Sequence, residues 1–148
     1  MTLTVTGVFC VLFGLVCVIG QLISTVDFGL AQKLGLQEGN EATEPLYRRL
    51  ELNTARWDLV VLWTLPCAGA LMLAGHEWWP FLALVAGGVH VDTAGRETAK
   101  VLGLAKEGVK TGTRTETRLF FSFLGAMLLI GLWCVAYGLA VLTIRHQM

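Results

Sequence analysis

The stretch from Leu119 to Ile144, LFFSFLGAMLLIGLWCVAYGLAVLTI, decides the fold of this chain because it contains no charged residue. About 20 apolar residues in a helix cross the hydrocarbon core of a bilayer, so the stretch predicts a membrane-spanning helix. Three more uncharged runs precede it, namely Met1–Val26, Leu59–Gly75 and Trp78–Val91. The sequence therefore predicts an all-α membrane protein, a bundle of four transmembrane helices at about residues 4–26, 57–76, 78–97 and 119–144.

Ten of the eleven Lys and Arg residues lie in the two segments that separate the first run from the second and the third from the fourth. Basic residues concentrate in the cytoplasmic loops of membrane proteins. We therefore expect residues 27–56 and 98–118 to form cytoplasmic loops. With four crossings, both termini then lie on the non-cytosolic side.

The composition supports an integral, multi-pass membrane protein. The chain is 55% hydrophobic and 15% charged, with a mean hydropathy of +0.65, whereas soluble domains average about 25% charged residues. We expect residues 1–148 to form one membrane domain whose environment is the lipid bilayer. The net charge is zero, which gives no indication of a nucleic-acid partner. No paired-His motif or zinc-type Cys spacing occurs, so no metal site is expected.

The third apolar run is too short to span a membrane alone. From Trp78 to Val91 a helix covers about 21 Å at 1.5 Å per residue, against a core of about 30 Å. The residues that follow it must therefore enter the membrane, and polar groups at that depth need partners inside the bundle. The polar side chains concerned are His90, Asp92, Thr93, Arg96 and Glu97.

These polar residues form two groups on the expected helix. His90, Thr93 and Glu97 share one face, while Asp92 and Arg96 form an i, i+4 pair of opposite charge. We expect this region to face the second span. The alternative is that Arg96 and Glu97 only extend to the lipid headgroups.

The second span has a polar entry. Thr43 and Pro45 mark a helix start, and the residues that follow carry several charged and polar side chains, namely Arg48, Arg49, Glu51, Asn53, Arg56 and Asp58. Judged from the lengths of the spans, Arg56 and Asp58 reach the level of Arg96, so we expect one of them to meet it. Such a cluster suits an anionic or zwitterionic headgroup, and it equally suits an interhelical salt-bridge network.

Each predicted span also carries small residues that let helix backbones approach closely in lipid. These are Gly7, Gly14 and Gly20 in the first span, Ala70 and Ala74 in the second, Ala83 and Gly87 in the third, and Gly131, Cys134 and Gly138 in the fourth. Pro66 interrupts the second span and predicts a kink there. We therefore expect a compact bundle, and further copies of the chain or other subunits of a membrane complex as its partners.

The segment Arg48-Arg49-Leu50-Glu51-Leu52-Asn53 resembles the Arg-Arg-Ala-His-Leu-Asn core of the MAPEG family, the membrane-associated glutathione and eicosanoid proteins. The segment Arg118–Phe123, RLFFSF, is similar to the family's Arg-Ala-x-x-Phe-Phe at the start of the fourth span. The resemblance implies a trimer that binds glutathione between subunits near the cytosolic face, with an Arg assisting thiolate formation. Arg48, Arg49 and Arg118 would then be the catalytic residues. The chain departs from the motif at Glu51, where the family has His, and at Arg56, where it has an acidic residue.

Three classes of function remain open at this point. The first is MAPEG-like glutathione-dependent transfer to an amphipathic substrate, the second a non-catalytic subunit or scaffold of a membrane complex, and the third a small oligomeric ion or proton transporter that uses His90, Asp92 and Glu97. For the functions that require a binding site, we expect this site at the cytosolic end of the bundle. The candidate ligand-binding residues are Glu51, Asn53, Arg56, Asp58, His90, Asp92, Arg96 and Glu97.

Overall fold

Residues 2–147 of the computed structural model are described, and they form an all-α structure. The helices are α1 (Leu3–Val26), α2 (Phe28–Lys33), α3 (Pro45–Val61), α4 (Thr64–Leu73), α5 (Trp79–Lys106) and α6 (Arg114–His146). Among the described residues the only β-type pairing is an isolated bridge between Thr43 and Thr111. The predicted all-α class is confirmed.

Three helical segments are long and apolar enough to cross a membrane, namely α1, the combined segment Pro45–Leu73, and α6. These segments make the chain a small, multi-pass integral membrane protein by length and composition. α5 is not among them, because its second half carries Asp92, Arg96, Glu97 and Lys100. α5 is nonetheless 28 residues long and packs against both α4 and α6.

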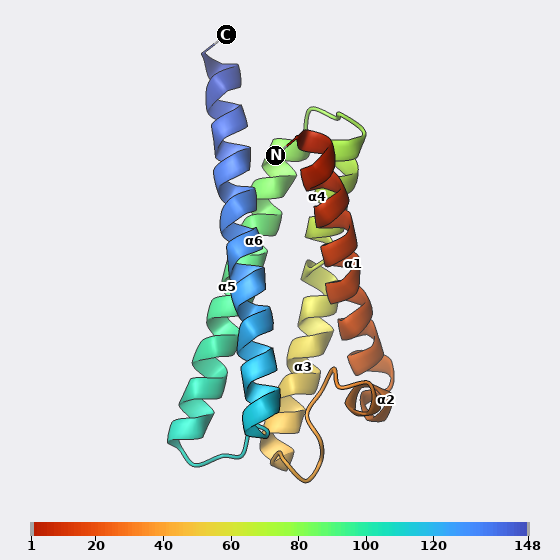
Figure 1. The fold of residues 1–148 in the computed structure, drawn as a ribbon, viewed down its shortest axis with the longest axis vertical. Coiled ribbons are helices and arrows are strands. Elements are labelled where there is room, and N and C mark those ends of the chain that lie inside the picture. The colour runs from red at the N-terminus through yellow and green to blue at the C-terminus, as the bar shows by residue number, and fades with distance from the viewer. Residues whose placement is uncertain (1, 148) are drawn as a thin grey trace.

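The long helices alternate in direction along the bundle (Figure 1). α1 packs on α3 and α4, α4 packs on α5, and α5 packs most extensively on α6. The two chain ends lie at the same end of the bundle as the α4–α5 turn. α2 and the connections 34–44 and 107–113 lie at the opposite end, which is the end that carries most of the basic residues.

The second predicted span is broken rather than bent. Pro45 occupies the first turn of α3, as expected for a residue whose missing N–H is not needed there. Pro66 has no N–H to donate to the carbonyl of Leu62, and the helix is interrupted at Leu62 and Trp63. The backbone N–H of Cys67 then bonds to Trp63 O at 3.1 Å, so the helix resumes at once as α4.

Helical structure extends into both segments that the sequence assigned to loops. α2 and the first half of α3 occupy much of residues 27–56, and α5 continues to Lys106. α6 begins at Arg114, where Thr113 and Glu116 form a capping box that satisfies the first free backbone donors. The connection between α5 and α6 therefore consists only of residues 107–113.

Most of the predicted small residues lie where helices approach closely, although Ala70 and Ala74 of α4 are exposed. An added Cβ on Gly14 would lie 2.4 Å from Pro66 Cδ, and one on Gly87 would lie 2.6 Å from the carbonyl oxygen of Gly131. The predicted packing faces of α1, α5 and α6 are thus correct at these positions. Gly20 differs, because a Cβ there would meet nothing within 4 Å.

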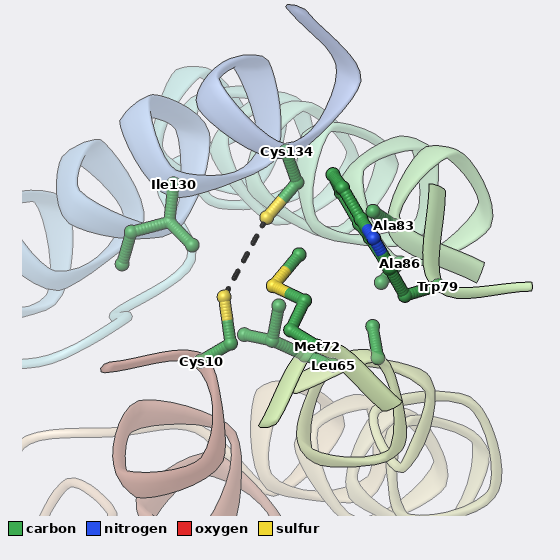
Figure 2. Close-up of a cluster of buried hydrophobic side chains, with 9 residues drawn as sticks. Cys10, Leu65, Met72, Trp79, Ala83, Ala86, Ile130 and Cys134 are labelled. Carbon is green, nitrogen blue, oxygen red and sulfur yellow. Dashed lines mark hydrogen bonds between the residues drawn. The ribbon is translucent and has the colours of Figure 1, made fainter. Parts of the chain in front are cut away.

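α1 and α6 close the bundle through side chains near its middle. Figure 2 shows Cys10 of α1 and Cys134 of α6 pointing toward each other within a buried apolar cluster, with their Sγ atoms 3.9 Å apart. One level nearer the loops, the rings of Phe13 and Phe123 stack with their centroids 5.8 Å apart. Beyond this stacked pair, toward the loops, α1 and α6 leave a space between them.

Candidate functional site

The expected ion cluster between the second and third predicted spans is present. Arg96 Nη2 of α5 lies 2.7 Å from Asp58 Oδ1 of α3, and the Asp58 side chain is only 1% exposed. Arg96 also lies 3.7 Å from Asp92 and 3.8 Å from Glu97. The prediction that Arg96 meets Asp58 or Arg56 is therefore confirmed for Asp58.

Lys100 is the member of this cluster that the sequence reasoning missed. Its Nζ lies 2.7 Å from Glu51 Oε1, contacts the Glu97 carboxylate, and donates a hydrogen bond to Thr54 Oγ1 at 3.3 Å. The third span was expected to end near Glu97, which placed Lys100 in a loop. Lys100 lies three residues after Glu97, so it would have been recognised as an i, i+3 partner of Glu97 if the helix had been predicted to continue beyond that residue.

His90 lies apart from the ion cluster. Glu97, Thr93 and His90 are all buried, as their shared helical face predicted. The Nδ1 of His90, however, lies 2.9 Å from Ala86 O in its own helix, and its ring lies 6.5 Å from that of Phe13. The Asp92 side chain is 72% exposed. The three residues expected to form an ion path thus have three different surroundings.

Of the motif residues of α3, Glu51 joins the ion cluster through Lys100, whereas the Arg residues do not. Arg48 Nη1 donates to the carbonyl oxygens of Asn40 and Thr43 at 3.0 and 2.8 Å, which ties the preceding connection to the helix. Four other predicted site residues are exposed on the outer surface of the chain, namely Arg49, Asn53, Arg56 and Arg118. In the single chain, the predicted catalytic residues form no common site.

A cavity of about 430 Å³ lies between α1 and α6, on the loop side of the Phe13–Phe123 pair. Its deeper wall is apolar and includes Val16, Leu62, Leu119, Phe120, Phe123 and Met127. Its loop end is polar and includes Gln21, Ser24, Gln32, Gln37, Glu38 and Glu116. We call this space the α1–α6 cavity. Its size and its mixture of an apolar wall with a few polar groups are typical of small-molecule sites.

Residues 34–44 close the polar end of the cavity. Gln32 Nε2 donates to Glu38 O at 2.7 Å, and Gln37 Nε2 donates to Ser24 Oγ at 3.3 Å. The same segment is joined to the α5–α6 connection, because the N–H of Glu44 donates to Lys110 O at 3.1 Å. The positions of the polar side chains are therefore fixed by several independent contacts.

Glu38 is the principal charged group at this end. The Tyr47 hydroxyl donates to Glu38 Oε1 at 3.2 Å. Burial raises the pKa of the Glu38 carboxyl to about 7, and the negative charges of Glu51 and Glu116 act in the same direction. The carboxyl therefore changes its charge close to neutral pH.

None of the polar residues of the cavity was among the predicted site residues. Gln21 and Ser24 could have been singled out, because they are polar residues spaced i, i+3 in a mostly apolar helix. Glu38 carried no such signal, since it lies in a connection whose path depends on tertiary contacts. Leu62 lines the cavity and donates its backbone N–H to Asp58 O one turn earlier, so the cavity and the ion cluster are neighbours.

Within the described residues no group of three or more His, Cys, Asp or Glu side chains is placed to hold a metal ion. Comparison of the chain with known protein families, with curated proteins and with solved structures finds no match. The function must therefore be argued from the geometry of the chain itself.

Proposed function

We propose that this membrane protein binds an amphipathic small molecule in the α1–α6 cavity. The observation that carries the proposal is the graded lining of the cavity, with Phe120 and Phe123 at the apolar end and Glu38 at the polar end. A lipid-like molecule presents the same gradient, because its chain lies toward the bilayer centre and its head toward the interface. The site would thus receive such a molecule without reversing its orientation in the membrane.

The side of the proposed ligand site that faces the bundle is formed by buried side chains. Leu62 is 1% exposed and Met127 is 2% exposed, and the Phe13–Phe123 pair closes the inner end. The inner side of the apolar end is therefore formed by packed side chains, whereas Val16 and Leu119 on its outer side are 62% and 67% exposed.

Gly20 offers a direct test, since a side chain added there meets open space in the cavity rather than backbone. We expect Gly20→Phe to fill the cavity and to weaken the binding of a fluorescent single-chain alkyl probe by about tenfold or more, which corresponds to about 1.4 kcal/mol. The measurement is probe titration of purified protein in lipid nanodiscs.

The matched control is Gly88→Phe. Gly88 lies on the exposed face of α5 and also has open space around its Cβ position. This variant should bind the probe as the wild type does. Equal affinities for all three proteins would contradict the location of the site.

A second candidate function follows from an exposed polar stripe on α3. Arg49, Asn53 and Arg56 are spaced i, i+4, i+7 and all are exposed, so they form one face that a second copy of the chain could cover. This stripe supports the MAPEG-like proposal of a homo-oligomer that binds glutathione between subunits. Calorimetric titration of glutathione, with Arg49→Ala as the variant that should lose binding, tests it. Co-purified partner proteins without glutathione binding would favour a scaffold function. Ion flux into proteoliposomes would favour a transporter.

We further propose that α5 is a fourth span and that the loop end faces the cytosol, with both termini on the other side. The length of α5 and its packing between α4 and α6 support this arrangement. Cysteines introduced at the exposed positions Glu77 and Lys110, in a Cys67→Ala background, should then react with an impermeant thiol reagent from opposite sides of the membrane. Reaction of both from one side would contradict it.

A further inference from the structure

We propose that the ligand of the α1–α6 cavity is a single-chain amphiphile with a cationic head that donates hydrogen bonds, such as an alkyl ammonium or alkyl guanidinium compound. This inference rests on the proposed function and adds the chemistry of the head. It follows from the groups at the polar end of the cavity, which are rich in acceptors and in negative charge.

The charges at the polar end all have one sign. Glu38 and Glu116 are among the lining residues, whereas no Lys, Arg or His is. The two carboxylates flank Gly112, since a Cβ built there would lie 3.0 Å from Glu38 Cγ and 3.5 Å from Glu116 Oε2. An anionic head would be repelled by this pair, and a cationic head would be attracted.

The uncharged groups add hydrogen-bond acceptors. The amide oxygens Oε1 of Gln21 and Gln37 are buried and have no hydrogen-bond partner among residues 2–147. Buried acceptors without partners cost free energy, which a donor removes. A head that carries N–H groups supplies such donors, whereas a carboxylate or sulfonate head supplies none.

Glu38 is the carboxylate that is free to bind this head. Both oxygens of Glu116 already accept backbone donors, from Thr113 at 2.7 Å and from Gly39 at 3.4 Å. Glu38 Oε1 accepts from the neutral Tyr47 hydroxyl. A cation beside Glu38 would form a charge-assisted ion pair with this carboxylate.

The titration of Glu38 gives the proposal a distinctive pH dependence. The groups that face Glu38 are Tyr47 and Glu51 from α3 and Glu116 from α6, of which Glu51 is paired with Lys100 and Glu116 with backbone donors. With a pKa of about 7, the ionised fraction of Glu38 rises from about 0.1 at pH 6 to about 0.9 at pH 8. Since the cation binds the ionised form, its affinity should increase up to about tenfold over this interval.

The experiment compares dodecylguanidinium, which stays charged and donates N–H bonds, with dodecanesulfonate, a matched permanent anion, on the full chain in nanodiscs of zwitterionic lipid. We expect the cation to bind at least about tenfold more tightly than the anion near pH 8 and to weaken toward pH 6. Glu38→Gln should reduce the preference and remove the pH dependence, while leaving the thermal midpoint close to that of the wild type. Glu41→Gln, an equal charge change at an exposed position of the same segment, should preserve both.

The possible outcomes distinguish a failure of the proposed function from a failure of the inference about the cationic head. If both probes bind equally and Gly20→Phe blocks both, the cavity binds amphiphiles but the inference about the head is wrong. Unchanged cation affinity and pH dependence in Glu38→Gln would also overturn it. If neither probe binds the wild type, both the proposed function and the cationic head are rejected.

Discussion

Replacing Lys100 with Ala is expected to destabilise the folded protein by about 3–5 kcal/mol, the typical cost of removing one partner from a buried ion pair. Lys100 contacts both Glu51 and Glu97, whose side chains are 8% and 4% exposed. Without it, Arg96 is the remaining cation among Asp58, Glu51 and Glu97. Glu51 would then be left in a poorly solvated place without a close positive charge, and Glu97 would keep only its longer contact with Arg96 at 3.8 Å.

Thermal unfolding of the detergent-purified protein measures this effect. Lys106→Ala is the matched control, because Lys106 is an exposed Lys at the end of the same helix and should change the midpoint little. Adding Glu51→Gln to Lys100→Ala should restore part of the lost stability by removing one unpaired charge. A Lys100→Ala midpoint equal to that of Lys106→Ala would show that the cluster is well hydrated.

Gly87→Val is expected to separate α5 from α6 and to cost about 3 kcal/mol or more, at the upper end of overpacking effects. A Cβ at Gly87 would lie 2.6 Å from Gly131 O and 2.9 Å from Val135 N. These neighbours are backbone atoms, so no side-chain rotation relieves the clash. The contact is reciprocal, since a Cβ at Gly131 would lie 2.8 Å from Gly87 O.

Gly88→Val provides the comparison for this substitution. It introduces the same β-branched side chain one position further along α5, where the Cβ meets nothing within 4 Å. Its thermal midpoint and its yield of monodisperse protein should stay near those of the wild type, while both should fall strongly for Gly87→Val. Similar behaviour of the two variants would mean that α5 and α6 are less closely packed than the structure indicates.

The sequence predicts the parts of the fold that depend on local patterns. Uncharged runs predict the helices, small residues such as Gly14 and Gly87 predict the close contacts, and the short third run predicts that Arg96 needs a partner inside the bundle. The position of Pro66 predicts a kink, although the helix is interrupted one turn earlier at Leu62. Each of these follows from helical periodicity or from the chemistry of one residue.

The cavity could not be predicted in the same way. It exists because α1 and α6, which are distant in sequence, meet at Phe13 and Phe123 and leave a space beyond that contact. Glu38 reaches this space only because the connection after α2 folds back across the bundle end. The basic residues pointed to Arg96 and to an anionic or zwitterionic headgroup or a salt-bridge network, whereas the lining of the cavity is acidic. Lys100 was missed because the third span was expected to end too early.

Photo-crosslinking with a single-chain alkyl probe that carries a diazirine near its terminal methyl group tests the proposed ligand site most directly. The account predicts that labelled peptides from protein in nanodiscs contain Val16 of α1 and Phe120, Phe123 or Met127 of α6, and that an excess of unlabelled amphiphile or the Gly20→Phe substitution abolishes this labelling. Labelling confined to exposed apolar residues such as Leu129 and Trp133, and unaffected by competitor, would contradict the account.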